Sequence, residues 1–112
     1  MGTRSLISIK NEDGTYDGVY CHFDGYPTGV GATLNRFYKT EEKIRELISR
    51  GDMSCLEGEL DDCEFYTKRG EELHNYKGLQ ANVILKKALD VGCEYFYTFC
   101  NGLWLVDELY DA

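Results

Sequence analysis

The sequence predicts an α+β fold: an antiparallel sheet built from N-terminal and C-terminal β-hairpins, with about three helices packed largely on one face. Two observations lead to this prediction. At each end of the chain, two runs of residues rich in strand formers are joined by a short turn. Between these ends lie segments whose apolar residues recur at helical spacing. With 112 residues, 43% of them hydrophobic, the chain is expected to form a single domain, residues 1–112.

The N-terminal hairpin is predicted from RSLISIK (4–10) and TYDGVYCHF (15–23), which alternate around the turn NEDG. Its register decides which side chains share a face, because a slip of one residue moves every side chain to the other side. If Ile7 lies beside Val19, the opposite face carries three polar side chains. These are Arg4, Tyr20 and His22.

Three helices are expected between the hairpins. The first follows a glycine-rich segment, where apolar residues from Val30 to Tyr38 fall at helical spacing. The second has Thr40 as its N-cap, two acidic residues in its first turn, and Gly51 after its end. The third is LQANVILKKALDVG, residues 79–92.

The remaining elements are a short strand, a loop and the second hairpin. CEFYTKRGEE (63–72) predicts a short strand followed by a turn, and HNYKG (74–78) predicts a loop. In residues 93–109, two aromatic-rich runs flank Asn101-Gly102, the strongest two-residue hairpin signal. Core packing beneath the helices accounts for these aromatic side chains, and a homodimer interface through the same hairpin is the alternative.

Composition argues against several classes of function. A net charge of −8 disfavours broad binding of nucleic-acid backbones, which requires clustered lysine and arginine. No run approaches the ~20 apolar residues of a membrane span. The five cysteines form no CxxC pair, which predicts reduced thiols in a cytoplasm and no metal site. The sequence contains no cofactor fingerprint, so none is expected.

The segment VYCHFDGYPTGVG (19–31) is the main candidate for a functional site. His22 and Asp24 point the same way if the strand continues, and such a pair positions an imidazole for proton transfer or binds a polar ligand. Gly29 and Gly31 allow close backbone approach before the next helix. An ordinary turn explains the same residues equally well.

FYTKRGEE (65–72) is a second candidate, because Lys68 and Arg69 beside Glu71 combine an anion clamp with an acid in one loop. A solvated charged loop is the structural alternative.

Four segments together resemble a family of small phage and prophage proteins. They are GTRSLI (2–7), DGTYDGVYCHFDGYPTGVG (13–31), FYTKRGEE (65–72) and EYFYTFCNGLWLVDE (94–108). The family pattern includes an opening GTRS-I strand, a YCHWDGYPEGVG-like segment, an FYxxRGE-like segment and a closing aromatic hairpin. This chain departs from the pattern at Phe23, where Trp is usual, and at Thr28, where an acid is usual.

The resemblance implies a phage-encoded accessory protein in the cytoplasm of an infected bacterial host cell. Its expected action is to bind rather than to catalyse, countering a host function such as a defence system by sequestering a small anionic, nucleotide-like ligand or by binding a host protein. The resemblance also implies that the scattered polar segments form one pocket. The residues expected to line it are Arg4, Tyr20, His22, Asp24, Tyr26, Gly29, Gly31, Arg69 and Glu71.

Two other functions remain open. One is a small hydrolase that cleaves a nucleotide or phosphodiester, with His22 as general base and Asp24 or Glu71 orienting it. The other is an acidic protein that inhibits a host nucleic-acid-binding enzyme by occupying its basic groove.

Overall fold

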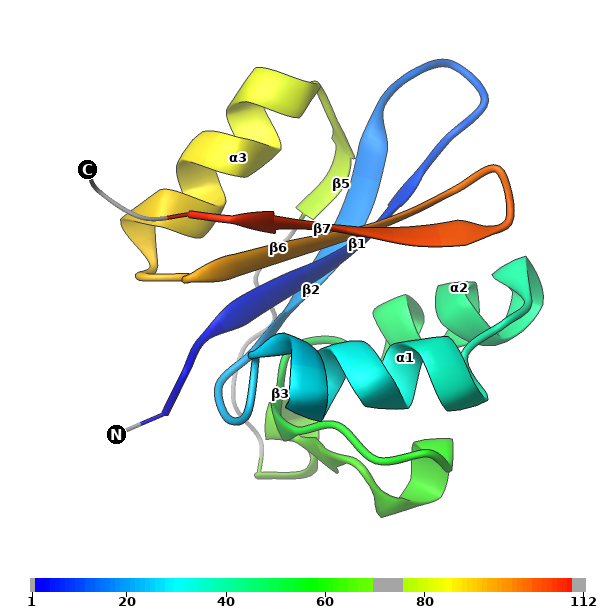
Figure 1. Ribbon diagram of the computed structural model, residues 1–112, viewed down its shortest axis with the longest axis vertical. Coiled ribbons are helices and arrows are strands. Elements are labelled where there is room, and N and C mark those ends of the chain that lie inside the picture. The colour runs from blue at the N-terminus through cyan, green and yellow to red at the C-terminus, as the bar shows by residue number, and fades with distance from the viewer. Residues whose placement is uncertain (1, 70–75, 110–112) are drawn as a thin grey trace.

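Within the residues that the computed structural model describes, 2–69 and 76–109, a seven-stranded mixed sheet has helices on both faces (Figure 1). Neighbouring strands follow the order β4-β3-β2-β1-β6-β7, and β5 also pairs with β2. The strands are β1 (Ser5–Lys10), β2 (Tyr16–Cys21), β3 (Met53–Cys55), β4 (Glu64–Phe65), β5 (Tyr76–Leu79), β6 (Tyr95–Cys100) and β7 (Leu103–Glu108). The α-helices are α1 (Ala32–Phe37), α2 (Glu41–Arg50) and α3 (Ala81–Asp90).

Both predicted hairpins are present. β1 and β2 are antiparallel, and Ile7 lies opposite Val19, the register on which the polar grouping depends. β6 and β7 are joined through Asn101 and Gly102, whose φ angles of 53° and 79° suit a two-residue turn that needs two positive φ values.

The prediction of an antiparallel sheet is wrong in two places. β1 pairs with β6 in parallel, with Ile7 opposite Tyr97, and β2 pairs with β3 in parallel at Cys21 and Met53. Parallel neighbours need a crossover long enough to return to the same end of the sheet. Helices provide it, since α1 and α2 lie between β2 and β3 in the chain, and α3 lies between β5 and β6. Alternation in sequence identifies a strand but not its direction relative to a distant neighbour.

The helices are divided between the two faces. α1 and α2 pack on the face that includes Ile7 and Ile9, where they contribute Leu34, Ile44 and Leu47 to the larger hydrophobic core. α3 packs on the other face, so only two of the three helices share a side. Its core includes Leu6, Tyr20, Ile84, Ala88 and Phe96. β1 is therefore covered on both faces, which explains why five of its six residues are buried.

Short strands complete the outer edge of β2. β3 pairs with the end of β2 at Cys21, whereas β5 pairs with its first half, from Tyr16 to Gly18. The short strand expected in residues 63–72 is β4, which leads into a 3₁₀ turn at Tyr66–Arg69. The loop expected at 74–78 is wrong for Tyr76–Gly78, which belong to β5, and the rest of that segment lies outside the described residues.

Candidate functional site

Three of the predicted site residues come together where β1 begins and β2 ends. Leu6 lies opposite Tyr20, so alternation places Arg4, Tyr20 and His22 on the face that α3 covers. The Tyr20 hydroxyl lies 2.8 Å from His22 Nδ1. Burial raises the pKa of the Tyr20 phenol, and the charge of the Arg4 guanidinium acts in the opposite direction. We call these three residues the Arg4 site.

Arg4 is held in place through the turn after α3. Its Nη1 donates to the carbonyl oxygen of Val91 at 3.0 Å. A Cβ atom on Gly92 would lie 2.9 Å from the same nitrogen, and Gly92 has a φ of +84°. Gly92 therefore does two things: it ends the helix and leaves space for the guanidinium. Within the described part of the chain, Arg4 forms no ion pair.

Burial controls the protonation of Tyr20. Desolvation raises its pKa to about 12, although Arg4 opposes the rise, so the phenol stays protonated near neutral pH. The Tyr20 hydroxyl and His22 Nδ1 share a hydrogen bond whose donor depends on the tautomer of the ring. This bond leaves Nε2 as the ring nitrogen available to a ligand. Phe23, 40% exposed, packs edge-on against the His22 ring at 4.6 Å and offers an aromatic surface beside it.

Asp52 is a buried carboxylate behind the site that the sequence analysis missed. Its side chain is 1% exposed, and Oδ1 accepts a 3.0 Å hydrogen bond from the backbone amide of Tyr20. The sequence signal was an acidic residue directly after the helix-ending Gly51 and before the apolar Met53. The buried thiol of Cys93 has its pKa raised to about 12 by desolvation, with Arg4 lowering it and Asp52 raising it. Asp52 and Arg4 thus have opposite effects on the pKa of the same buried thiol.

Asp24 and Tyr26 form a separate turn. β2 ends at Cys21, and Asp24 has a left-handed φ of 59°, so strand alternation does not continue to Asp24. Its carboxylate accepts a 3.0 Å hydrogen bond from the Tyr26 hydroxyl, and its carbonyl accepts one from Val30 at 2.8 Å. The expected His–Asp pair does not form: the Asp24 carboxylate bonds to Tyr26, and His22 Nδ1 bonds to Tyr20.

The glycines of this segment are packed against the protein itself. A Cβ on Gly29 would collide with the carbonyl oxygen of Asp24, and one on Gly31 would lie 3.1 Å from the Tyr97 hydroxyl. That hydroxyl donates to the carbonyl of Gly25 at 2.7 Å. Neighbouring segments of the chain therefore occupy the space that these glycines leave.

The remaining predicted site residues lie at the edge of the described chain. Arg69 closes the 3₁₀ turn that follows β4, and its backbone is placed while its side chain is not. Glu71 lies outside the described residues.

Neither a metal cluster nor a membrane helix occurs in residues 2–69 and 76–109. No three His, Cys, Asp or Glu side chains there gather closely enough to hold a metal ion. None of the helices in the same ranges has the length and apolar character to cross a bilayer. Comparisons with protein-family models, curated proteins and solved structures find no match for this chain.

Proposed function

We propose that the protein is a phage-encoded accessory protein that binds a small anionic, nucleotide-like ligand at the Arg4 site and thereby counters a host function. One observation supports this most directly: the Arg4 guanidinium, without an ion pair among the described residues, lies beside a hydrogen-bonded Tyr20–His22 pair. The phage assignment rests on the resemblance of its four sequence segments to small phage proteins.

Each residue of the site has a distinct role in this proposal. Arg4 offers a planar set of donors that matches the oxygens of a phosphate or carboxylate. His22 offers Nε2 to the ligand, and Tyr20 fixes the orientation of the imidazole ring through Nδ1. Tyr20 itself is only 8% exposed, so Phe23 is the better-placed ring to stack on a base.

Binding accounts for this geometry better than hydrolysis does. A general base needs a hydrogen-bonded partner that stabilises its protonated form, and carboxylates do this well. The partner of His22 is instead a phenol whose pKa burial raises to about 12. A hydrolase using His22 would therefore have Tyr20 rather than Asp24 as the partner of Nδ1, while Glu71, the other orienting residue that the sequence predicted, lies outside the described residues.

Native mass spectrometry tests the proposal. Protein purified from a phage-infected bacterial lysate should carry a small mass that denaturation releases. Arg4→Gln should abolish that mass, whereas Arg36→Gln, which removes an exposed arginine on α1, should retain it. A wild-type protein without bound mass, or equal retention in Arg4→Gln, contradicts the proposal. Trp104 fluorescence checks that both variants are folded.

The same sample separates the other two functions. If wild-type protein changes the mass of the released ligand over time and His22→Ala does not, the protein is a hydrolase. If a host protein co-purifies through a salt-sensitive contact that Arg4→Gln leaves intact, the −8 surface is the functional feature.

A further inference from the structure

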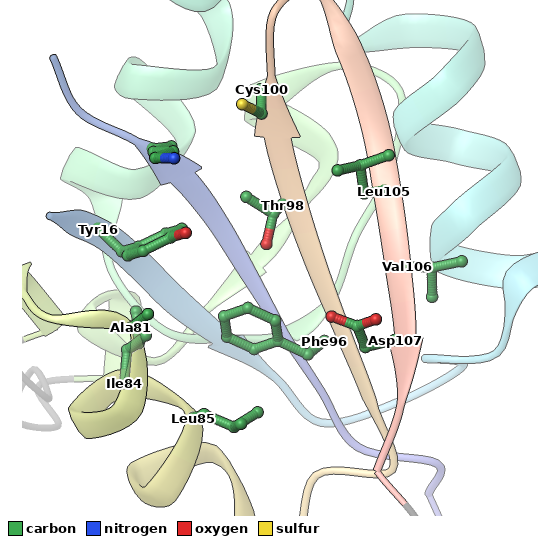
Figure 2. A pocket seen from close by; sticks show the side chains of 11 residues that line it. Tyr16, Ala81, Ile84, Leu85, Phe96, Thr98, Cys100, Leu105, Val106 and Asp107 are labelled. Atoms are coloured by element: carbon green, nitrogen blue, oxygen red, sulfur yellow. The ribbon is translucent and has the colours of Figure 1, made fainter. Parts of the chain in front are cut away.

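A groove lies between α3 and the last two strands, on the same face as the Arg4 site but at the other end of β1. Its volume is about 470 Å³, within the ~300–1,000 Å³ range of small-molecule sites. Figure 2 shows Leu85 of α3 on one side of it and Leu105 of β7 on the other, with Phe96 and Thr98 between them.

The groove exists because a row of three small side chains crosses the sheet and ends at a larger one. Register places Gly18, Ser8 and Thr98 side by side on β2, β1 and β6, with Leu105 of β7 next to Thr98. The next row in one direction contains Tyr20, Leu6, Phe96 and Asp107. In the other direction Lys10 lies opposite Tyr16, and Cys100 lies opposite Leu103. The middle row is therefore lower than its neighbours at Gly18, Ser8 and Thr98. α3 covers this row only at Gly18, where an added Cβ would lie 3.3 Å from the side chain of Ile84.

Charges of opposite sign lie at the two ends of the groove. Lys10 is at one end opposite Tyr16, and Asp107 is at the other opposite Phe96. Strand spacing and rise separate their Cα atoms by roughly 15 Å. Neither side chain forms an ion pair with another residue in the described ranges. Leu85 and Leu105 between them are 37% and 56% exposed.

We propose that this groove binds a small molecule with an apolar body and one anionic group. The body packs against Phe96, Leu85 and Leu105, and the anionic group pairs with Lys10 within reach of the Tyr16 hydroxyl. Asp107 sets the orientation, because it repels an anionic group placed at its end. This site is separate from the Arg4 site, so either one can fail without the other.

Charge favours a small anion at Lys10 over a second copy of the chain. Self-association would bring two chains of net charge −8 together and add two Asp107 carboxylates to one interface. A single anionic group at this end of the groove pairs with Lys10, which forms no ion pair with another residue in the described part of the chain.

A fluorescent probe of this chemistry tests the site. 1-Anilinonaphthalene-8-sulfonate has an apolar body and one sulfonate, and its emission rises in an apolar site. Leu85→Glu should raise its Kd about fivefold or more, because a carboxylate then lines the groove. Leu89→Glu is the matched control: the same change, on the same helix, at a residue 46% exposed that does not line the groove. It should change the Kd less than about twofold.

A second pair of measurements tests the role of the lysine. Lys10→Gln should weaken the sulfonate probe but not N-phenyl-1-naphthylamine, which has the same body without the charge. Lys39→Gln, an exposed lysine between α1 and α2 on the other side of the sheet, should affect neither. Equal effects of Leu85→Glu and Leu89→Glu overturn the site, and equal effects of Lys10→Gln on the two probes overturn the anionic group. Sedimentation equilibrium showing a dimer that Leu85→Glu dissociates would assign the groove to a second copy and overturn the proposal.

Discussion

Replacing Tyr97 by phenylalanine tests how the turn at residues 24–31 is held against the sheet. Tyr97 lies in β6 and is 1% exposed, and its hydroxyl donates to the Gly25 carbonyl at 2.7 Å. The substitution keeps the ring and removes this donor from a buried carbonyl. Losing one partner of a buried hydrogen bond costs ~1–3 kcal/mol, so we expect the free energy of unfolding to fall by about 2 kcal/mol.

The same loss has a predictable thermal effect. For 112 residues the entropy of unfolding is roughly 0.24 kcal/mol/K, so 2 kcal/mol lowers Tm by about 8 °C. Urea unfolding followed at Trp104, the single tryptophan, measures the free energy directly. Its indole donates to the Tyr38 carbonyl at 2.8 Å and its ring packs against Phe99, so unfolding changes its surroundings. The urea slope should stay constant, because the surface exposed on unfolding does not change.

Tyr26→Phe is the matched control for this prediction. Its hydroxyl donates to Asp24 in the same turn at 3.0 Å, but the residue is 39% exposed, so water replaces the lost partner. We expect a change below about 0.5 kcal/mol. The reasoning is refuted if Tyr97→Phe costs no more than this, or if Tyr26→Phe costs as much as Tyr97→Phe.

Three further predictions concern a buried thiol, a closely packed glycine and a buried carboxyl group. Burial raises the pKa of Cys21 from 9.0 to about 12, so its contribution to stability is complete below pH 9 and is lost as the pH rises toward 12. Between pH 8 and pH 10 the free energy of unfolding of wild type should fall by about 1.4 kcal/mol more than that of Cys21→Ala, and equal slopes would contradict this. Gly29→Ala should cost about 2 kcal/mol in urea unfolding, because its Cβ meets the Asp24 carbonyl; unchanged stability would mean that the turn does not need this glycine for packing. Asp52→Ala should lower the free energy of unfolding by about 2 kcal/mol and accelerate amide exchange at Tyr20, whose N–H loses its acceptor. An unchanged exchange rate would show that another group accepts this hydrogen bond.

Local rules predicted the elements that depend on a few adjacent residues. Thr40 caps α2 by accepting from the Lys43 amide at 3.3 Å, and Gly51 ends that helix with a φ of +94°. Asn101 and Gly102 form the expected tight turn. In each case the conformation is set by the backbone preference or side-chain hydrogen bond of the residues concerned, which the sequence states directly.

The Arg4 site was partly predictable for the same reason. Once Ile7 lies opposite Val19, strand alternation alone places Tyr20 and His22 on one face with Arg4. Asp24 was expected to point the same way as His22 on the condition that the strand continues. Its positive φ ends the alternation two residues after His22, and an aspartate adopts that conformation at small cost.

The sequence by itself determined the two hairpins, the three helices and the short strand β4, where the tight turns lie, and which side chains of one hairpin share a face, but it did not predict β3 or β5. Tertiary structure decided that β6 lies parallel to β1, that β3 and β5 divide the edge of β2, and that Asp52 comes to lie behind Tyr20. It also decided that a row of small residues from three strands lies beneath a groove. The physical reason is the range of the interactions. Propensity, capping and alternation act within about one turn or one strand, whereas strand order depends on which arrangement buries both faces of β1 beneath helices that lie far apart in the chain.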